Sequence, residues 1–328
     1  MTVVLGVDGG GTKTHVLIAD AAGALLGAAT GGITNWEDVG VESTGAALRA
    51  AVLEAAQSAG VSLGDIDSTT IGLAGVDWPS DLDRLGAIPE SLGLGGRWEI
   101  VNDAFVALRA GANHPWGIAV IAGSGSVVAG RSPDGTEFRT LGLGTTFGDF
   151  GGAADIAIEA IRCVAEAYTG LSPATTMTER FMEAYGVPTT AALLEHLSRA
   201  DPRTDHLAPL VLAAAAEGDG AAKGLVERAG SSLGTAAGLV ARRLGIESQT
   251  FEVVLAGGVI RAGDRQMLMA LDRELHRAAP SATAVRLEVP PVVGAALRAL
   301  EAVGETPSGP EHLRLSMESM KILEYEFA

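Results

Sequence analysis

The sequence predicts an α/β protein built from two related lobes. A unit of three short apolar stretches separated by turns occurs twice along the chain, and stretches of strand length alternate with stretches of helical periodicity around these units. Repetition of a whole supersecondary unit is typical of duplicated lobes, and the alternation is typical of α/β proteins. With 328 residues, 47% of them hydrophobic, the chain is long enough to bury two cores.

The first copy of the unit lies at the N-terminus. Strands are expected at 3–7, 15–20 and 24–30, and the first two are separated by the glycine turn Asp8-Gly9-Gly10-Gly11-Thr12. A helix at 43–60, a strand at 69–73, a helix at 81–92 and a short strand at 99–101 follow, ending at Asn102-Asp103.

The second copy has the same order. Strands are expected at 117–122, 127–130 and 136–141, and the first two are separated by Gly123-Ser124-Gly125-Ser126. A mostly helical region at 153–244, a strand at 251–256, a helix at 264–278, a strand at 284–288 and a helix at 293–303 complete the lobe. We therefore divide the chain into lobes 1–112 and 113–304 and a tail, 305–328.

Composition excludes several classes of function. The chain carries 40 Asp and Glu against 23 Lys and Arg, a net charge of −17, which disfavours nucleic-acid and membrane-surface partners. Cys163 is the single cysteine and the six histidines show no ligand spacing, so disulfide, zinc and iron–sulfur sites lack their ligands. No signal peptide or apolar run of about 18 residues occurs, and we expect a cytoplasmic protein.

The two glycine turns are candidate phosphate-binding loops. Glycines allow backbone N–H groups to approach an anion, and Asp8 at the end of a strand is placed to hold hydrated Mg²⁺. The first turn is not a Walker A loop, because Thr12 stands where that motif needs lysine and a strand follows. The alternatives are a plain hairpin turn for the first and a linker for the second.

Three later segments allow both a structural and a functional interpretation. Asn102-Asp103 ends a strand and is suited either to cap the next helix or to supply a general base in the ligand crevice. The segment 148–152 is either a helix cap or part of a substrate site. Gly257 and Gly258 form either a close strand-to-helix turn or a flat surface for a planar ring.

Together these segments resemble the actin, sugar kinase and Hsp70 superfamily, and more narrowly the N-acetylglucosamine kinase and BadF/BadG/BcrA/BcrD ATPase family. The resemblance covers about residues 3–303. Its carriers, in family order, are Gly6 to Thr14, Thr34-Asn35, Asn102-Asp103-Ala104, Ala122 to Ser126, Gly148-Asp149-x-Gly151 and Leu255 to Val259.

The resemblance implies a two-lobed actin-like ATPase fold of ribonuclease H type, with duplicated βββαβαβα domains and ATP and sugar between them. It implies an ATP-dependent, Mg²⁺-requiring kinase of a hexose or amino sugar, most plausibly acting on O6 of N-acetylglucosamine, with a homodimer as one possible assembly. Asp103 is the implied general base and Asp8 the residue that orients Mg²⁺ through water. Nucleotide contacts are implied for Gly10, Gly11, Thr12, Lys13, Gly123, Ser124, Gly125, Ser126, Gly257 and Gly258, and sugar contacts for Asn35, Asn102, Asp103, Gly144 and Asp149.

The sugar side departs from the family pattern. Where N-acetylglucosamine kinases have Gly-Trp-Gly and Gly-Asp-Glu-Gly-Ser, this chain has Leu143, Phe150 and Gly152 at the three differing positions. Specificity for the N-acetyl group is therefore open. The other hypotheses are a kinase of another sugar such as glucosamine, an ATPase that activates a partner through an iron–sulfur cluster, and a sensor without activity. The missing cysteine-rich zinc motif excludes the repressor and kinase branch of the superfamily.

Overall fold

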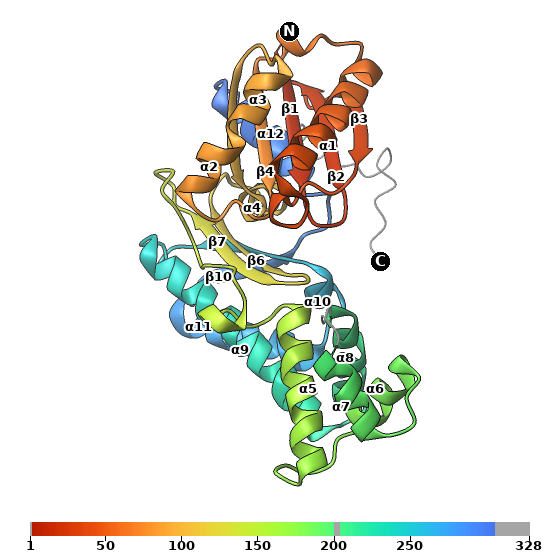
Figure 1. The fold of residues 1–328 in the computed structure, drawn as a ribbon. Coiled ribbons are helices and arrows are strands. Elements are labelled where there is room, and N and C mark those ends of the chain that lie inside the picture. Colours follow the sequence, from red (N-terminus) through yellow and green to blue (C-terminus); the bar gives the residue numbers. More distant parts are fainter. Residues whose placement is uncertain (1, 200–203, 306–328) are drawn as a thin grey trace.

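The computed structural model describes residues 2–199 and 204–305 and places them in two lobes, each built on a five-stranded sheet (Figure 1). Apart from residue 305, the tail expected at 305–328 lies outside the described residues. No helix in the described part of the chain has the length and apolar character needed to cross a bilayer.

The first part of the chain, up to residue 111, supplies ten elements. They are β1 (Val3–Gly9), β2 (Thr14–Asp20), β3 (Leu25–Gly31), α1 (Trp36–Ala59), the 3-10 turn η1 (Leu63–Asp65), β4 (Ser68–Leu73), α2 (Pro79–Leu85), α3 (Ala87–Leu92), β5 (Arg97–Asn102) and α4 (Asp103–Gly111).

The second part of the chain supplies fifteen elements among the described residues. They are β6 (Gly117–Ala122), β7 (Ser126–Arg131), β8 (Glu137–Arg139), η2 (Thr145–Phe147), α5 (Ala153–Thr169), α6 (Met177–Tyr185), α7 (Thr190–Arg199), η3 (Asp205–Leu207), α8 (Ala208–Ala216), α9 (Gly220–Arg243), β9 (Phe251–Ala256), α10 (Gly258–Arg261), α11 (Arg265–Ala278), β10 (Ala282–Arg286) and α12 (Val292–Ala302).

The strand orders confirm the two-lobed α/β fold with its duplicated unit. One sheet has the order β3-β2-β1-β4-β5 and the other β8-β7-β6-β9-β10, so each strand of the first has a counterpart in the second. In both sheets the first strand pairs antiparallel with the second and parallel with the fourth. The apolar stretch at 3–7 is buried on both faces, because helices cover both sides of the sheet.

Helix α12 packs on the first sheet rather than on the second. The lobe boundary drawn from the sequence assigned this helix to residues 113–304, but its apolar side chains cluster with those of β1 and β2. A Cβ atom at Gly6 of β1 would lie 2.4 Å from the backbone nitrogen of Ala296. Figure 1 shows the blue α12 among the red and orange elements of the first lobe. A sequence boundary cannot detect such a return, because chain order and spatial order differ here.

Several element boundaries also differ from expectation. Helix α1 begins at Trp36, seven residues before the expected start at 43, because Asn35 caps it and Gly40 introduces a kink at φ 80°. The helix expected at 81–92 is two helices that meet at Gly86. The third strand of the second unit spans only three residues.

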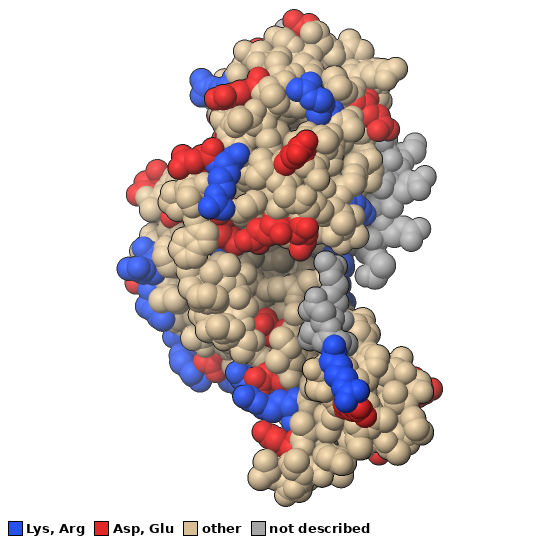
Figure 2. Space-filling view, in the orientation of Figure 1, with Lys and Arg blue, Asp and Glu red and all other residues tan. Residues whose placement is uncertain are grey.

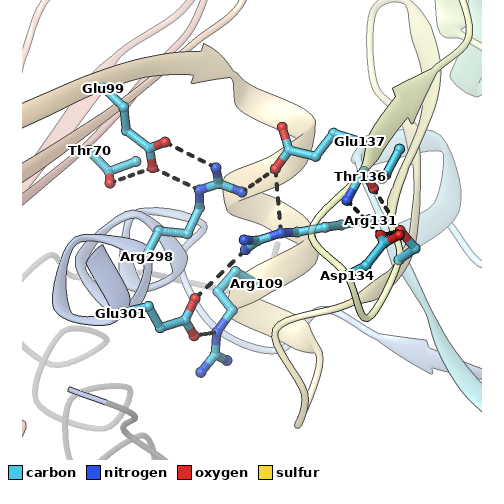
Figure 3. A network of polar contacts seen from close by, with 10 residues as sticks. Thr70, Glu99, Arg109, Arg131, Asp134, Thr136, Glu137, Arg298 and Glu301 are labelled. Carbon is cyan, nitrogen blue, oxygen red and sulfur yellow. Dashed lines mark hydrogen bonds and ion pairs between the residues drawn. The ribbon is translucent and has the colours of Figure 1, made fainter. Parts of the chain in front are cut away.

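A network of ion pairs joins α12 to both sheets (Figure 3). The buried Arg298 donates hydrogen bonds to Glu99 of β5 at 3.0 and 3.2 Å and to Glu137 of β8 at 2.8 Å. Glu301, one turn later, pairs with Arg109 of α4 at 2.5 Å and with Arg131 of β7 at 3.9 Å. The last described helix is therefore tied by charge to elements of both lobes.

We expect Arg298→Ala to destabilise the protein, because it removes the hydrogen-bonded cation of Glu99 and leaves Glu137 with only the longer ion pair to Arg131 at 3.8 Å. The free energy of unfolding should fall by about 2–3 kcal/mol, less than the ~3–5 kcal/mol of a fully buried pair because both glutamates keep contact with water. Chemical denaturation measures the change. Arg131→Ala, which removes only longer pairs of 3.8 and 3.9 Å, is the control and should cost at most ~1 kcal/mol. Equal losses in both variants would contradict this account of the network.

Candidate active site

The carboxyl ends of β1, β4 and β5 bring three carboxylates to one edge of the first sheet. These strands are parallel neighbours, with Asp8 in register with Gly72 and Leu73 with Asn102. Asp8 therefore lies at the same edge as Asp103, the first residue of α4, and as Asp77, in the segment that follows β4. Ligands of open α/β sheets bind outside this edge. Figure 2 shows the surface hollowed between the two lobes, with acidic side chains along the upper rim.

The first glycine turn is fixed at its base and open at its tip. The Gly10 nitrogen donates to the Lys13 carbonyl at 3.2 Å, and the Gly10 carbonyl accepts hydrogen bonds from the nitrogens of Thr34 and Asn35 at 3.1 and 3.2 Å. Gly11, Thr12 and Lys13 are exposed. The turn that was predicted to bind phosphate thus presents accessible groups, and its base is joined to the segment that carries Asn35.

The three carboxylates at this edge have raised pKa values. Burial, and then the negative charge of Asp103, raise the pKa of Asp8 to about 7, although Lys13 opposes the shift. Burial raises the pKa of Asp103 to about 6; the Ala104 amide and Arg139 lower it, and Asp77 raises it further. Burial also raises the pKa of Asp77, against the nearby cation of Arg139.

This donor set fits a hydrated divalent cation. A cation beside Asp8 would relieve the repulsion between two buried carboxylates. The described residues include no group of three or more His, Cys, Asp or Glu side chains arranged to hold a metal. Mg²⁺ suits such a site, because it usually keeps several waters and takes further ligands from substrate phosphates.

The second glycine turn packs on the start of helix α5. The nitrogens of Ala153 and Ala154 donate to the carbonyls of Gly123 and Ser124 at 2.8 and 2.9 Å. Ser124 and Gly125 are exposed, whereas the Ser126 side chain is buried. The Ser124 hydroxyl donates to Asp205 at 3.2 Å, so the helical region reaches this turn.

Gly257 lies at the equivalent edge of the second sheet, beside the second glycine turn. Its φ is +99°, and a Cβ atom there would lie 2.2 Å from the carbonyl oxygen of Ala122. Only glycine fits this approach. The exposed Gly258 then begins α10.

A cavity of about 770 Å³ lies near the end of α10. Its walls are the end of α8, the start of α9 and the turn from α10 into α11, with Ala213, Ala216, Ala262 and Gly263 as small apolar lining residues and Lys223 and Arg265 as cations. Its size and mixed lining are typical of small-molecule sites.

The predicted sugar residues lie on three segments. The Asn35 amide nitrogen donates to Asp38 at 2.9 Å at the start of α1. Asp149 accepts a hydrogen bond from the Leu143 nitrogen at 3.0 Å, and its own nitrogen donates to the Gly144 carbonyl at 3.2 Å. Asn102 is buried and caps α4, accepting from the Ala104 nitrogen at 3.1 Å. The capping interpretation of Asn102 is therefore confirmed.

Sequence reasoning missed two residues of this region, Asp77 and Arg139. They form an ion pair of 3.0 Å between the segment after β4 and strand β8. Neither residue lies in a glycine turn or another recognisable motif. A single aspartate and a single arginine far apart in the sequence give no signal that they meet.

Two of the three departures from the family pattern, Phe150 and Gly152, pack tightly in the structure. Phe150 is buried, and the guanidinium carbon of Arg228 lies 4.1 Å from the centre of its ring. A Cβ atom at Gly152 would lie 2.4 Å from the backbone of Gly125. The second glycine turn thus occupies the space that a serine would need.

The duplicated sheets, with a glycine turn after the first strand of each, define a two-lobed protein of the actin-like ATPase and sugar kinase fold. The chain belongs to the BadF/BadG/BcrA/BcrD ATPase family, whose sequence profile matches residues 5–299. The resemblance noted from the sequence is therefore confirmed.

Two named kinases and one solved structure are similar to this chain over most of its length. The chain is 29% identical over 263 residues to the N-acetylmuramic acid/N-acetylglucosamine kinase of Clostridium acetobutylicum, covering 79% of this chain and 86% of that one. It is 28% identical to the N-acetyl-D-glucosamine kinase of Dictyostelium discoideum, covering 91% and 98%. A crystal structure from Chromobacterium violaceum, provisionally named an N-acetylglucosamine kinase, matches with a TM-score of 0.69 and 27% identity over 90% of this chain and 98% of that chain.

We expect Gly152→Ser to destabilise the protein, because the added atoms meet the backbone of Gly125. Overpacking of this kind costs about 1–3 kcal/mol. Thermal and chemical unfolding measure the loss. Gly224→Ser is the matched control, since a Cβ atom there meets nothing within 4 Å and serine favours a helix more than glycine does. Unchanged stability of Gly152→Ser would show that the second glycine turn is free to move aside.

Proposed function

We propose that this protein is an ATP-dependent sugar kinase that transfers the γ-phosphate of ATP to the 6-hydroxyl of N-acetylglucosamine. The observation that carries the proposal is the half-buried carboxylate of Asp103 at the edge that also holds Asp8 and the first glycine turn. Membership of an ATPase family and the two kinases at 28–29% identity support it.

In this proposal the two glycine turns hold the phosphates. The exposed Gly11, Thr12 and Lys13 contact the β- and γ-phosphates, and Gly10, whose nitrogen closes the turn on the Lys13 carbonyl, holds them in place. Ser124 and Gly125 contact the phosphates from the second lobe, while the buried Ser126 supports their turn. Gly257 and Gly258 lead from the phosphates toward the cavity of about 770 Å³, which is large enough to receive the adenosine.

Asp8 is the residue that would hold Mg²⁺ through water. When bound, the ion neutralises charge on the phosphates and orients the γ-phosphate for transfer. Lys13 adds a positive charge on the same turn. Because phosphoryl transfer depends chiefly on positioning and charge neutralisation, little further chemistry is required of the protein.

Asp103 accepts the proton of the attacking hydroxyl. As the sugar O6 bonds to the γ-phosphorus, the bond from phosphorus to the bridging oxygen of ADP breaks, and the O6 proton passes to the Asp103 carboxylate. A base whose pKa lies near 6 is largely ionised at neutral pH and still attracts a proton. The N-terminus of α4 favours this ionised form.

The sugar lies between Asn35 of the first lobe and the segment of Gly144 and Asp149 of the second. We assign Asn102 to positioning, because its amide nitrogen already donates to the Val76 carbonyl and to Asp77, both at 3.2 Å. Leu143 and Phe150 replace a tryptophan and a glutamate of the family pattern, so the segment of Gly144 and Asp149 differs from that pattern on both sides.

An acceptor screen with Mg-ATP tests the proposal. We expect ADP release that depends on N-acetylglucosamine, with glucose, glucosamine and N-acetylmuramic acid as the comparison sugars. Asp103→Asn should lower kcat by about 10²- to 10⁴-fold, the usual contribution of a general base, while the Kd for ATP stays within about twofold. Coupled assay and calorimetry measure the two quantities. Full turnover by Asp103→Asn, or the absence of phosphorylation with every sugar, would refute the proposal.

The pH profile provides an independent check on Asp103. Only the deprotonated carboxylate accepts a proton, so kcat at saturating Mg-ATP, where the bound cation keeps Asp8 ionised, should be level above about pH 6 and fall about tenfold for each pH unit below it, following the raised pKa of Asp103. Initial rates from pH 4.5 to 8.5, with a coupling system that stays active over this range, measure the acidic side of the profile. A break near pH 4, the ordinary value for aspartate, would contradict the assignment.

A further inference from the structure

Arg139 of strand β8 reaches from the second sheet to the first lobe. Its Nη2 atom donates to the Asp77 carbonyl oxygen at 2.5 Å and forms the ion pair with the Asp77 carboxylate at 3.0 Å. Both side chains are largely buried, with 14% and 10% of their surface exposed. Charge-assisted hydrogen bonds that are shielded from water are among the stronger polar contacts in proteins.

Asp77 links Arg139 to helix α4, whose first residue is the proposed base Asp103. The same carboxylate oxygen accepts a hydrogen bond from the Asn102 amide, which also binds the Val76 carbonyl. The Asn102 side-chain oxygen in turn caps α4 at the Ala104 nitrogen. Asp103 lies between Asn102 and Ala104 in the chain, so its position depends on this cap.

The other end of the guanidinium group organises the opposite wall of the proposed sugar site. Nη1 of Arg139 donates to the carbonyl oxygens of Thr140 and Leu141 at 2.9 and 2.6 Å. These residues begin the segment that leads to Gly144 and Asp149. The planar guanidinium group of Arg139, with several fixed donors, thus joins the segment of Asp77 to the segment that leads to Asp149. Lysine offers a single ammonium and cannot reproduce this geometry.

We infer that Arg139 is a positioning residue that acts through Asp77 and Asn102 to align Asp103 with the segment carrying Gly144 and Asp149 across the two lobes. This inference rests on the proposed kinase function for its effect on turnover, but the contacts it invokes can be tested without turnover. Arg139 and Asp77 were assigned no role from the sequence.

The test compares Arg139→Gln and Arg139→Lys with a matched control, Arg131→Gln. Arg131 lies on the neighbouring strand β7 and also pairs with glutamates, but at 3.8 and 3.9 Å and apart from the proposed sugar site. We expect Arg139→Gln to lower kcat by about 10- to 100-fold, since small misplacements of reacting groups have effects of this size. The Kd for ATP should stay within about twofold.

Arg139→Lys keeps the positive charge but not the planar set of donors. Its kcat should therefore lie between the kcat of Arg139→Gln and that of the unmodified protein. Arg131→Gln should keep kcat within about twofold of the unmodified protein. A kcat of Arg139→Gln within twofold of the control would overturn the inference. Equal loss of kcat and ATP affinity would also overturn it, because that result indicates general damage rather than misalignment.

Hydrogen exchange separates this inference from the proposed function. Arg139→Gln should accelerate amide exchange in 76–78, 102–105 and 140–149, whereas Arg131→Gln should leave these segments unchanged. If no sugar is phosphorylated but Arg139→Gln still accelerates exchange in these segments, the kinase proposal fails. The positioning contacts of Arg139 are then supported independently of it. Unchanged exchange in Arg139→Gln would overturn the inference whatever the activity of the unmodified protein.

Discussion

Helix α12 approaches β1 and α4 so closely that no side chain fits at the points of contact. A Cβ atom at Gly6 would meet the backbone of Ala296, and one at Gly294 would lie 1.9 Å from the Val106 carbonyl oxygen. These two elements carry Asp8 and Asp103. The relative position of the two carboxylates therefore depends on a helix from the other end of the chain. Arg298 on the same helix extends this dependence to the second sheet.

The acidic composition sets a limit on how an anion can be bound. With a net charge of −17, the protein places exposed glycine amides, hydroxyls and Lys13 at its two glycine turns rather than a cluster of arginines. Arg139, which is bonded to Asp77 at the sheet edge, already has carboxylate and carbonyl partners. Burial is the largest cause of the raised pKa values of Asp8 and Asp103, and a neighbouring carboxylate adds to the shift in each case. This charge balance is the reason why we propose that a divalent cation and a phosphorylated ligand bind at this edge together.

The departures from the family pattern at Gly152 and Phe150 have different physical causes. Gly152 follows from packing, because the second glycine turn leaves no room for a side chain there. Phe150 is a replacement of a charge by a ring, buried under Arg228. The first change lets residue 152 pack on the backbone of the second glycine turn. The second lies next to Asp149, which we propose contacts the sugar.

The sequence by itself determined the fold class, the duplicated unit, the family and the candidate residues, because glycine turns and strand ends are local patterns that a chain displays in order. The strands at 117–122 and 251–256 matched the structure to the residue. Only the tertiary structure placed α12 on the first sheet and brought Arg139 to Asp77, 62 positions apart. Such contacts depend on which surfaces meet after folding. A lone charged residue carries no periodicity or spacing from which its partner can be predicted.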